Sequence, residues 1–228
     1  MTIRLTWLGH GSWLIETQEN RIVLDPFLTD NPAAKVKPAD LGPVSHILVS
    51  HAHFDHIADV ATVAATGEPT LIANFEVAQW FQKHHGVQNA VGMNTGGTLT
   101  LPWGKVTMTP ALHSSSFPDG SYGGCPGGFL LDIADKRIYF ACDTAFFSDM
   151  AHYAHGVDLA ILPIGDLFTM GIEESIRAIR LIQPRNVAPA HYDTWPPIGQ
   201  DASEWAARVR SQTDAEPIVP AVGKPFEV

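Results

Sequence analysis

The most constraining feature of this sequence is an apolar run of strand length that leads directly into four metal-ligand side chains. Residues 46–50 read His-Ile-Leu-Val-Ser, a pattern typical of a strand buried on both faces. Residues 51–56 follow as His-Ala-His-Phe-Asp-His. Sheets in α/β proteins place their sites at the carboxyl ends of buried strands. The junction therefore predicts an α/β fold with a site at the end of this strand.

The spacing within 51–56 suits divalent metal ions, because imidazole and carboxylate groups are their usual ligands. On an extended segment, side chains two positions apart point the same way, so we expect His51 and His53 to lie together. Asp55 and His56 follow at the turn into the next helix, where they reach a second point nearby. One segment then serves two ions. The alternative is a surface histidine cluster, which the position after a buried strand disfavours.

Four ligands do not complete two metal shells, so we expect others at strand ends. His113 follows the strand predicted over 105–112, Asp143 follows the apolar run 138–142, and His191 follows the run 187–190. Taken singly, each is more readily explained as a hydrogen-bonded structural residue. Their common placement favours metal ligands.

The remaining pattern predicts a mixed α/β sandwich in which two β-rich halves each finish in helices. Predicted strands cover 3–8, 12–16, 21–25, 46–50, 70–73, 98–101, 104–112, 127–133, 137–141 and 158–162, and predicted helices cover 57–65, 145–154 and the segments after Asn74, Gly171 and Asp201. We find no linker, repeat or low-complexity stretch, and residues 1–228 are expected to form a single domain.

Composition excludes several classes of protein. The chain is 45% hydrophobic and 17% charged, and its apolar runs are far shorter than the ~20 residues of a membrane span, so we expect no membrane partner. The net charge of −10, without a basic cluster, disfavours nucleic acid. The first residues lack the features of a signal peptide, which predicts a cytoplasmic protein, and Cys125 and Cys142 are expected to be reduced thiols.

With these motifs in place, the chain resembles the metallo-β-lactamase superfamily, whose H-x-H-x-D-H signature matches 51–56, and within it a branch of metal-dependent hydrolases related to the ascorbate-6-phosphate lactonases. The segments that carry the resemblance are 7–12, 25–26, 51–56, 92–97, 113–116, 139–144, 162–165, 168–171 and 191–192. The resemblance implies a four-layered αββα sandwich. It also implies one ion on His51, His53 and His113, a second on Asp55, His56 and His191, and a bridging Asp143.

Four further residues are singled out near this site. Asp25 is a candidate acceptor of a hydrogen bond from a ligand imidazole, with a surface turn before Pro26 as the alternative. His10 is expected to be a pocket residue rather than a ligand, and Tyr192 a candidate proton donor. Cys142 stands where the superfamily usually has Gly, and we expect its thiol to pack away from Asp143.

Two ions that share a water would lower its pKa from about 15.7 to near 7, which supplies a hydroxide nucleophile. Asp143 would offset the repulsion between the ions, and Asp55 could take the released proton. Zn²⁺ is the first expectation, and the two carboxylates leave Mn²⁺ or Fe²⁺ open. Ser114, Ser115, Thr169 and the segment 121–124 are expected to border the cleft, whereas core packing is favoured for Met170 and Trp195.

The leading functional prediction is a metal-dependent hydrolase of an ester, lactone or phosphodiester bond in a small-molecule substrate. An antibiotic-hydrolysing β-lactamase is disfavoured by the missing signal peptide, and a nuclease-like phosphodiesterase by the net charge of −10. A metal-binding sensor without turnover is the third alternative. Open coordination positions argue against it, because structural zinc sites close all four. The substrate, and whether the protein forms a homo-oligomer, stay open.

Overall fold

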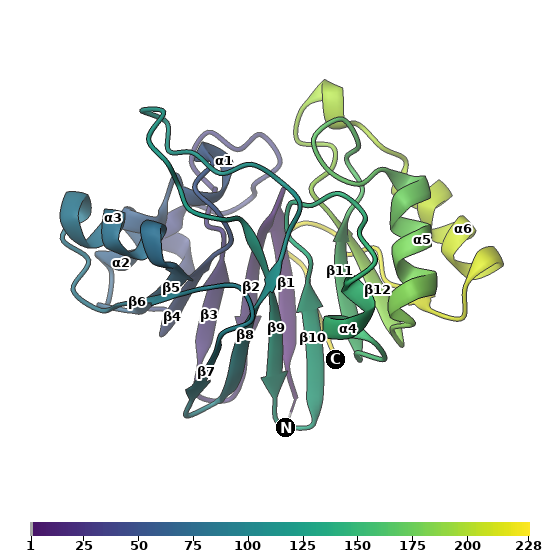
Figure 1. The fold of residues 1–228 in the computed structure, drawn as a ribbon, viewed down its shortest axis with the longest axis horizontal. Coiled ribbons are helices and arrows are strands. Elements are labelled where there is room, and N and C mark those ends of the chain that lie inside the picture. Colours follow the sequence, from purple (N-terminus) through teal and green to yellow (C-terminus); the bar gives the residue numbers. More distant parts are fainter. Residues whose placement is uncertain (1) are drawn as a thin grey trace.

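Two seven-stranded sheets packed face to face form the centre of the computed structural model, which describes residues 2–228 (Figure 1). The first sheet has the order β14-β1-β2-β3-β4-β5-β6 and the second β13-β12-β11-β10-β9-β8-β7. The strands are β1 (Arg4–Gly9), β2 (Ser12–Glu16), β3 (Arg21–Leu24), β4 (His46–Val49), β5 (Thr70–Asn74), β6 (Ala90–Met93), β7 (Thr98–Leu101), β8 (Gly104–Pro110), β9 (Gly127–Ile133), β10 (Lys136–Phe140), β11 (Leu159–Pro163), β12 (Asn186–Ala190), β13 (Glu216–Pro217) and β14 (Pro225–Glu227).

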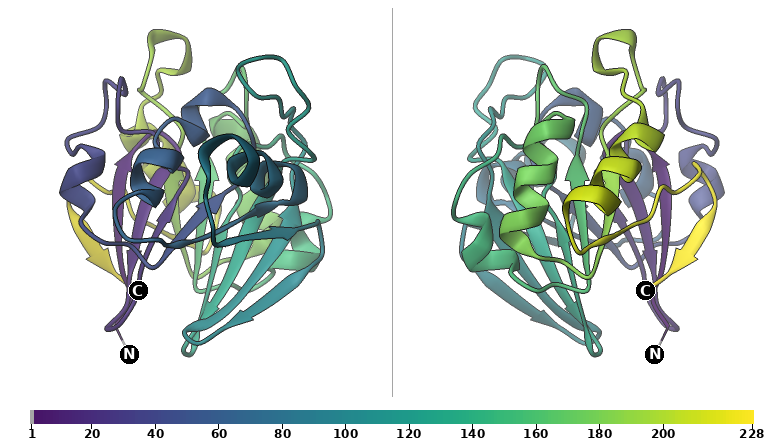
Figure 2. Two further views of the ribbon diagram at one scale, coloured as in Figure 1. Left: turned by 90° about the vertical axis from the view of Figure 1, so that its left-hand side faces the viewer. Right: turned by 90° about the vertical axis from the view of Figure 1, so that its right-hand side faces the viewer.

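Helices cover the outer face of each sheet, as the two side views show (Figure 2). The α-helices are α1 (Phe54–Ile57), α2 (Val60–Ala64), α3 (Phe75–His85), α4 (Met150–Ala154), α5 (Ile172–Ile182) and α6 (Ala202–Gln212), and two 3-10 helices span Pro38–Leu41 and Pro196–Ile198. α2 and α3 lie outside the first sheet, and α5 and α6 lie outside the second. The predicted four-layered αββα sandwich is confirmed. None of the helices in residues 2–228 is long and apolar enough to cross a membrane.

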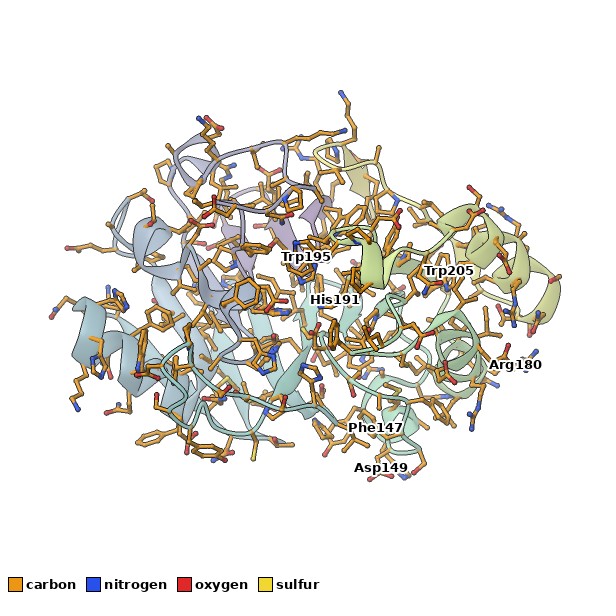
Figure 3. All side chains as sticks on the ribbon, turned by 90° about the horizontal axis from the view of Figure 1, so that it is seen from above. Phe147, Asp149, Arg180, His191, Trp195 and Trp205 are labelled. Atoms are coloured by element: carbon orange, nitrogen blue, oxygen red, sulfur yellow. The ribbon has the colours of Figure 1, made fainter. Side chains whose placement is uncertain are left out.

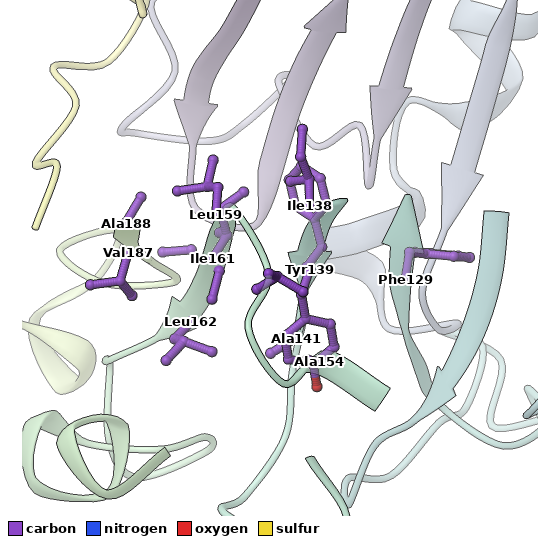
Figure 4. Close-up of a cluster of buried hydrophobic side chains, with 14 of the residues drawn as sticks. Phe129, Ile138, Tyr139, Ala141, Ala154, Leu159, Ile161, Leu162, Val187 and Ala188 are labelled. Carbon is purple, nitrogen blue, oxygen red and sulfur yellow. The ribbon is translucent and has the colours of Figure 1, made fainter. Parts of the chain in front are cut away.

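The apolar runs form strands because their successive side chains enter two different cores. In β4, Leu48 belongs to the core between the sheets, whereas Ile47 and Val49 belong to the core under α2 and α3. Ile72 and Leu71 of β5 divide in the same way. Figure 4 shows part of the larger core, where strands of the second sheet contribute most of the side chains. A strand buried on both faces needs apolar residues at every position, which is the pattern read from the sequence.

Strand direction brings the site residues together. β3 to β6 are parallel, and so are β10 to β13. β1 pairs antiparallel with β2, and β2 with β3, so β1 runs in the same direction as β3. In the second sheet, β8 pairs antiparallel with β9, and β9 with β10, so β8 runs in the same direction as β10. The carboxyl ends of β1, β3, β4, β8, β10 and β12 consequently meet at one edge of the sandwich, the upper edge in Figure 1, where α1 also lies.

Three predicted elements differ in their bounds by more than one residue. The helix expected over 57–65 begins at Phe54 and is interrupted at Asp59, whose side chain turns inward to accept hydrogen bonds from the chain at Leu28 and Thr29. The helix expected over 145–154 is shortened to α4, because Ala145 donates its backbone N–H to Leu112. β8 ends at Pro110 instead of 112, and the short strands β6, β13 and β14 were not predicted.

The Asp59 carboxylate provides a test of this packing. It is buried and accepts hydrogen bonds from Leu28 N at 2.6 Å, Thr29 N at 2.8 Å and Thr29 Oγ1 at 2.6 Å. We expect Asp59→Ala to lower the free energy of unfolding by about 2–4 kcal/mol, measured by urea denaturation, because buried donors lose their partner. Asp135→Ala, in the exposed turn between β9 and β10, should change it by less than about 0.5 kcal/mol. Equal effects of the two variants would contradict this interpretation.

Candidate metal centre

The segment after β4 carries four candidate ligands because the backbone changes conformation at His53. This residue is extended, with φ −65° and ψ 148°, and serves as the N-cap of α1. His51 and His53 therefore lie on the extended part, and Asp55 and His56 lie on the first helical turn. The side chains of His51 and His53 therefore point to a different place from those of Asp55 and His56, as the spacing predicted.

His51, His53 and His113 form the first cluster. His53 Nδ1 lies 3.0 Å from His51 Nε2 and 3.3 Å from His113 Nε2. One ligand atom from each of the three lies within 4.8 Å of the other two. Burial lowers the pKa of His51 well below its usual value, which favours the neutral imidazole that binds metal. Three converging imidazole nitrogens form a suitable site for one divalent ion.

Asp55, His56 and His191 form the second cluster, and Asp143 lies between the two. The Oδ2 atom of Asp143 is 3.0 Å from His191 Nε2, 3.3 Å from His56 Nε2 and 3.6 Å from His113 Nε2. Burial raises the pKa of Asp143, but His191 and His56 lower it by more, so the carboxylate is ionised. A single carboxylate oxygen thus contacts members of both clusters. His191 lies near the middle of the molecule when it is seen from above (Figure 3).

The donor set fits divalent cations. His56 Nε2 and His191 Nε2 are buried and make no hydrogen bond of proper geometry within residues 2–228, although Asp143 Oδ2 is near. A buried polar atom without a partner costs about 1–3 kcal/mol, so these nitrogens require a ligand at the point they face. A cation at that point would contact the imidazole nitrogens and Asp143 together.

Asp25 and Ser50 orient one ligand of each cluster. His56 Nδ1 donates to Asp25 Oδ2 at 2.8 Å, and Ser50 Oγ donates to the same oxygen at 2.6 Å. Ser50 Oγ can then accept from His51 Nδ1, which is 2.9 Å away. Burial lowers the pKa of His56, but Asp143 and Asp25 raise it by more. When each ring is neutral, these contacts leave Nε2 unprotonated and directed at the site. The predicted contact between Asp25 and a ligand imidazole is present, whereas Ser50 was not singled out from the sequence.

His10 contacts the second cluster through Asp55. His10 Nε2 donates to Asp55 Oδ2 at 3.0 Å, and His10 Nδ1 lies 2.8 Å from Thr194 Oγ1. Burial and the neighbouring His191 lower the pKa of His10 to about 4, so the ring is neutral and Nδ1 accepts from the hydroxyl. Geometry alone groups His10 with Asp55, His56 and His191 as a potential ligand. Because both of its nitrogens already have partners, we interpret it as a residue that orients Asp55.

Tyr192 and Cys142 are not among the candidate ligands, although Cys142 lines a small inner cavity together with His56, Asp143 and His191. Tyr192, expected at the pocket, is buried in the core, with its ring stacked on Trp7 at 5.0 Å, and does not line the cavity above the clusters. Because it is buried against Trp7 and does not line the cavity, Tyr192 is not placed to donate a proton there. Cys142 packs against the core and belongs to none of the groups of potential ligands in residues 2–228.

The turns after the strands are strained. His10, Asp25, Cys142 and His191 all adopt left-handed backbone conformations, with φ of 56°, 46°, 53° and 54°. Such conformations cost about 1–3 kcal/mol each for residues other than Gly and cluster at functional sites. The conformation at Cys142 also explains why Gly is usual at this position in the superfamily that the sequence resembles.

A cavity of about 530 Å³ lies over the two clusters. It is lined by His53, Phe54, Asp55, His113, Ser114, Asp143, Phe168, His191, Trp195, Pro197 and Ile198. Trp195 therefore borders the cleft, where core packing had been expected, whereas Met170 is buried as expected. The chain between β12 and α6 carries Trp195 across the second cluster, which the sequence pattern does not indicate.

Thr194 offers a test of the contact between His10 and Asp55. Thr194→Val keeps the shape of the side chain but removes the hydroxyl that fixes the tautomer of His10. We expect metal affinity, measured by competition with a chelator, to fall by less than the about 10–100-fold that is usual when the direct partner of a metal ligand is lost, because Thr194 acts on Asp55 only through His10. Thr98→Val, on the exposed strand β7, is the matched control. An unchanged affinity in Thr194→Val would show that His10 does not depend on this hydroxyl.

Known proteins support the assignment of this fold. The model of the beta-lactamase superfamily domain matches residues 20–192. A UPF0173 metal-dependent hydrolase of Thermus thermophilus is 44% identical over 211 residues, which is 92% of each chain. Another, of Methanosarcina mazei, is 38% identical over 231 residues, which is 99% of each chain.

A solved structure is also similar over the full length. A metallo hydrolase from Ignicoccus hospitalis has a TM-score of 0.89 and 32% identity, and the match covers 100% of this chain and 99% of that chain. The resemblance read from the sequence is thereby confirmed at the level of the superfamily. With matches of this length and identity, the chain belongs to the UPF0173 metal-dependent hydrolase family of the β-lactamase superfamily.

Proposed function

We propose that this protein uses two divalent metal ions to hydrolyse an ester, lactone or phosphodiester bond in a small molecule. The observation that carries the proposal is that five of the seven candidate ligands also line the cavity. They are His53, Asp55, His113, Asp143 and His191. A small molecule in the cavity would reach both ions, whereas structural metal sites are closed by protein ligands. The names of the related proteins are consistent with this chemistry.

In this proposal His51, His53 and His113 hold one ion, Asp55, His56 and His191 hold the other, and Asp143 contacts both. Bound ions of this kind act as Lewis acids and lower the pKa of a shared water. Zn²⁺ is our first choice for a site dominated by imidazole, with Mn²⁺ or Fe²⁺ as alternatives. Asp143 would offset the repulsion between the two cations.

Asp55 is the side chain that we assign to proton transfer. It lines the cavity, and its carboxylate is held by His10 at 3.0 Å. Burial raises the pKa of Asp55, but the hydrogen bond from His10 and the neighbouring His56 lower it by more. Asp55 therefore enters the reaction ionised and able to accept a proton. Tyr192 does not line the cavity and cannot protonate the leaving group there. The leaving group would therefore take its proton from Asp55, once Asp55 has been protonated, or from water.

Metal content tests the proposed ligands. We expect about two equivalents of divalent metal per chain in the metal-supplemented protein, measured by elemental analysis. His53→Ala should lower the metal content and abolish turnover, because His53 Nδ1 faces both other histidines of its cluster. Cys142→Ala is the matched control and should keep the metal, since its thiol packs into the core. Loss of metal in Cys142→Ala would assign the thiol to the site.

Turnover tests the proposed reaction. Bis(p-nitrophenyl) phosphate, a simple lactone and the β-lactam nitrocefin should be assayed with and without a chelator. We expect metal-dependent hydrolysis of the phosphodiester or the lactone and little hydrolysis of nitrocefin. If the metal-loaded protein hydrolyses none of the three, a metal-binding protein without turnover becomes the better interpretation. The chelator establishes that the observed hydrolysis depends on the metal.

A further inference from the structure

The cavity wall above the candidate ligands is almost entirely apolar. Apart from the ligands, the lining consists of Ser114 and five apolar residues, which are Phe54, Phe168, Trp195, Pro197 and Ile198. None of the 14 Lys and Arg side chains, all of which lie within the described residues 2–228, lines the cavity. Asp166 and Asp193, close to the cavity in sequence, are exposed and do not line it either.

One wall is built from three aromatic rings that fix one another. The rings of Phe54 and Trp195 have centroids 6.1 Å apart, and each lies 5.9 Å from the buried ring of Phe27 behind them. Trp195 also contacts the buried ring of His10 at 5.0 Å, edge to face. Phe54 nevertheless stays 55% exposed. The ring contacts thus fix the wall in place and leave part of its apolar surface exposed to the cavity.

Phe168 lines the same cavity as Phe54 and Trp195, and it comes from a strained loop between β11 and α5. Asp166 and Leu167 are both left-handed, with φ of 61° and 50°. Asp166 N donates to Met170 O at 3.1 Å, and the Met170 side chain anchors the loop in the core. Phe168 is 58% exposed although it lines the cavity. Core packing does not account for a strained turn that presents an aromatic ring to solvent, whereas contact with a ligand does.

We propose that the cavity selects substrates that carry no charge outside the reacting group and whose apolar, preferably aromatic, group packs between Phe168 and the wall of Phe54 and Trp195. This inference rests on the proposed function and narrows its substrate class. The ions bind the reacting group, so any further ionised group of the substrate would lie against apolar side chains without a partner. Placing an ionised group there is unfavourable, because the group loses water without gaining a partner. Placing an apolar group there is favourable, because its surface is removed from water.

A matched pair of esters tests the selectivity for charge. p-Nitrophenyl 6-methylheptanoate and mono-p-nitrophenyl adipate share a leaving group and acyl length, but the first ends in an isopropyl group and the second in a carboxylate too distant to attack its own ester readily. We expect the metal-loaded protein to hydrolyse the uncharged ester with kcat/KM at least about tenfold higher. A charged ester that is hydrolysed equally well or better would overturn the proposal.

Two neighbouring variants test the role of the loop. Phe168→Ala removes the ring from the cavity, and Leu167→Ala removes an equally exposed side chain that does not line it. We expect Phe168→Ala to raise KM for the uncharged ester by about fivefold or more with little change in kcat, and Leu167→Ala to change KM by less than about twofold. Equal effects would show that Phe168 is not a binding residue.

A binding measurement separates this inference from the proposed reaction. Calorimetry of 4-phenylbutan-2-one, an uncharged aromatic probe, on the metal-loaded protein needs no turnover. Binding that is weakened by Phe168→Ala but not by Leu167→Ala supports the apolar site even if no ester is hydrolysed, in which case only the proposed reaction fails. Probe binding that is absent or indifferent to Phe168 overturns the inference, whatever the hydrolytic activity.

Discussion

Asp143 brings one carboxylate oxygen within 3.6 Å of imidazoles that come from both sheets of the sandwich. His56 follows the first sheet, whereas His113 and His191 follow strands of the second. The site therefore exists only when the two halves of the chain are packed together. The inter-sheet core, with residues such as Leu48 and Phe129, holds that packing in place. A substitution that loosens the core between the sheets is therefore expected to disturb the geometry of the site as well.

The sequence allowed much of this arrangement to be predicted, because each of the four segments that carry candidate ligands begins just after a predicted strand. Strands buried on both faces leave a strong pattern, and parallel strands bring their carboxyl ends to one edge. The contact of Asp25 with His56 could be anticipated for the same reason. These features depend on local sequence and on strand direction, which a single chain reveals.

The rest depends on contacts between segments that are distant in sequence. Thr194 meets His10 across 184 positions, and Ser50 sits inside a run read only as strand. Trp195 was expected in the core, although the loop after β12 places it at the cavity. The inward turn of Asp59 toward Leu28 broke a helix whose composition was favourable throughout. No periodic pattern marks such positions, because loop paths are set by tertiary hydrogen bonds.

The shared use of Asp25 by His56 and, through Ser50, by His51 has a consequence for how the centre is assembled. Asp25 thus fixes the tautomer of one imidazole in each cluster. The two clusters are therefore linked electrostatically through Asp25 as well as through Asp143. A cation that withdraws charge from one imidazole strengthens the hold of the common acceptor on that ring and weakens it on the other. In the proposed two-ion site, Asp25 would therefore couple the occupancy of one position to that of the other.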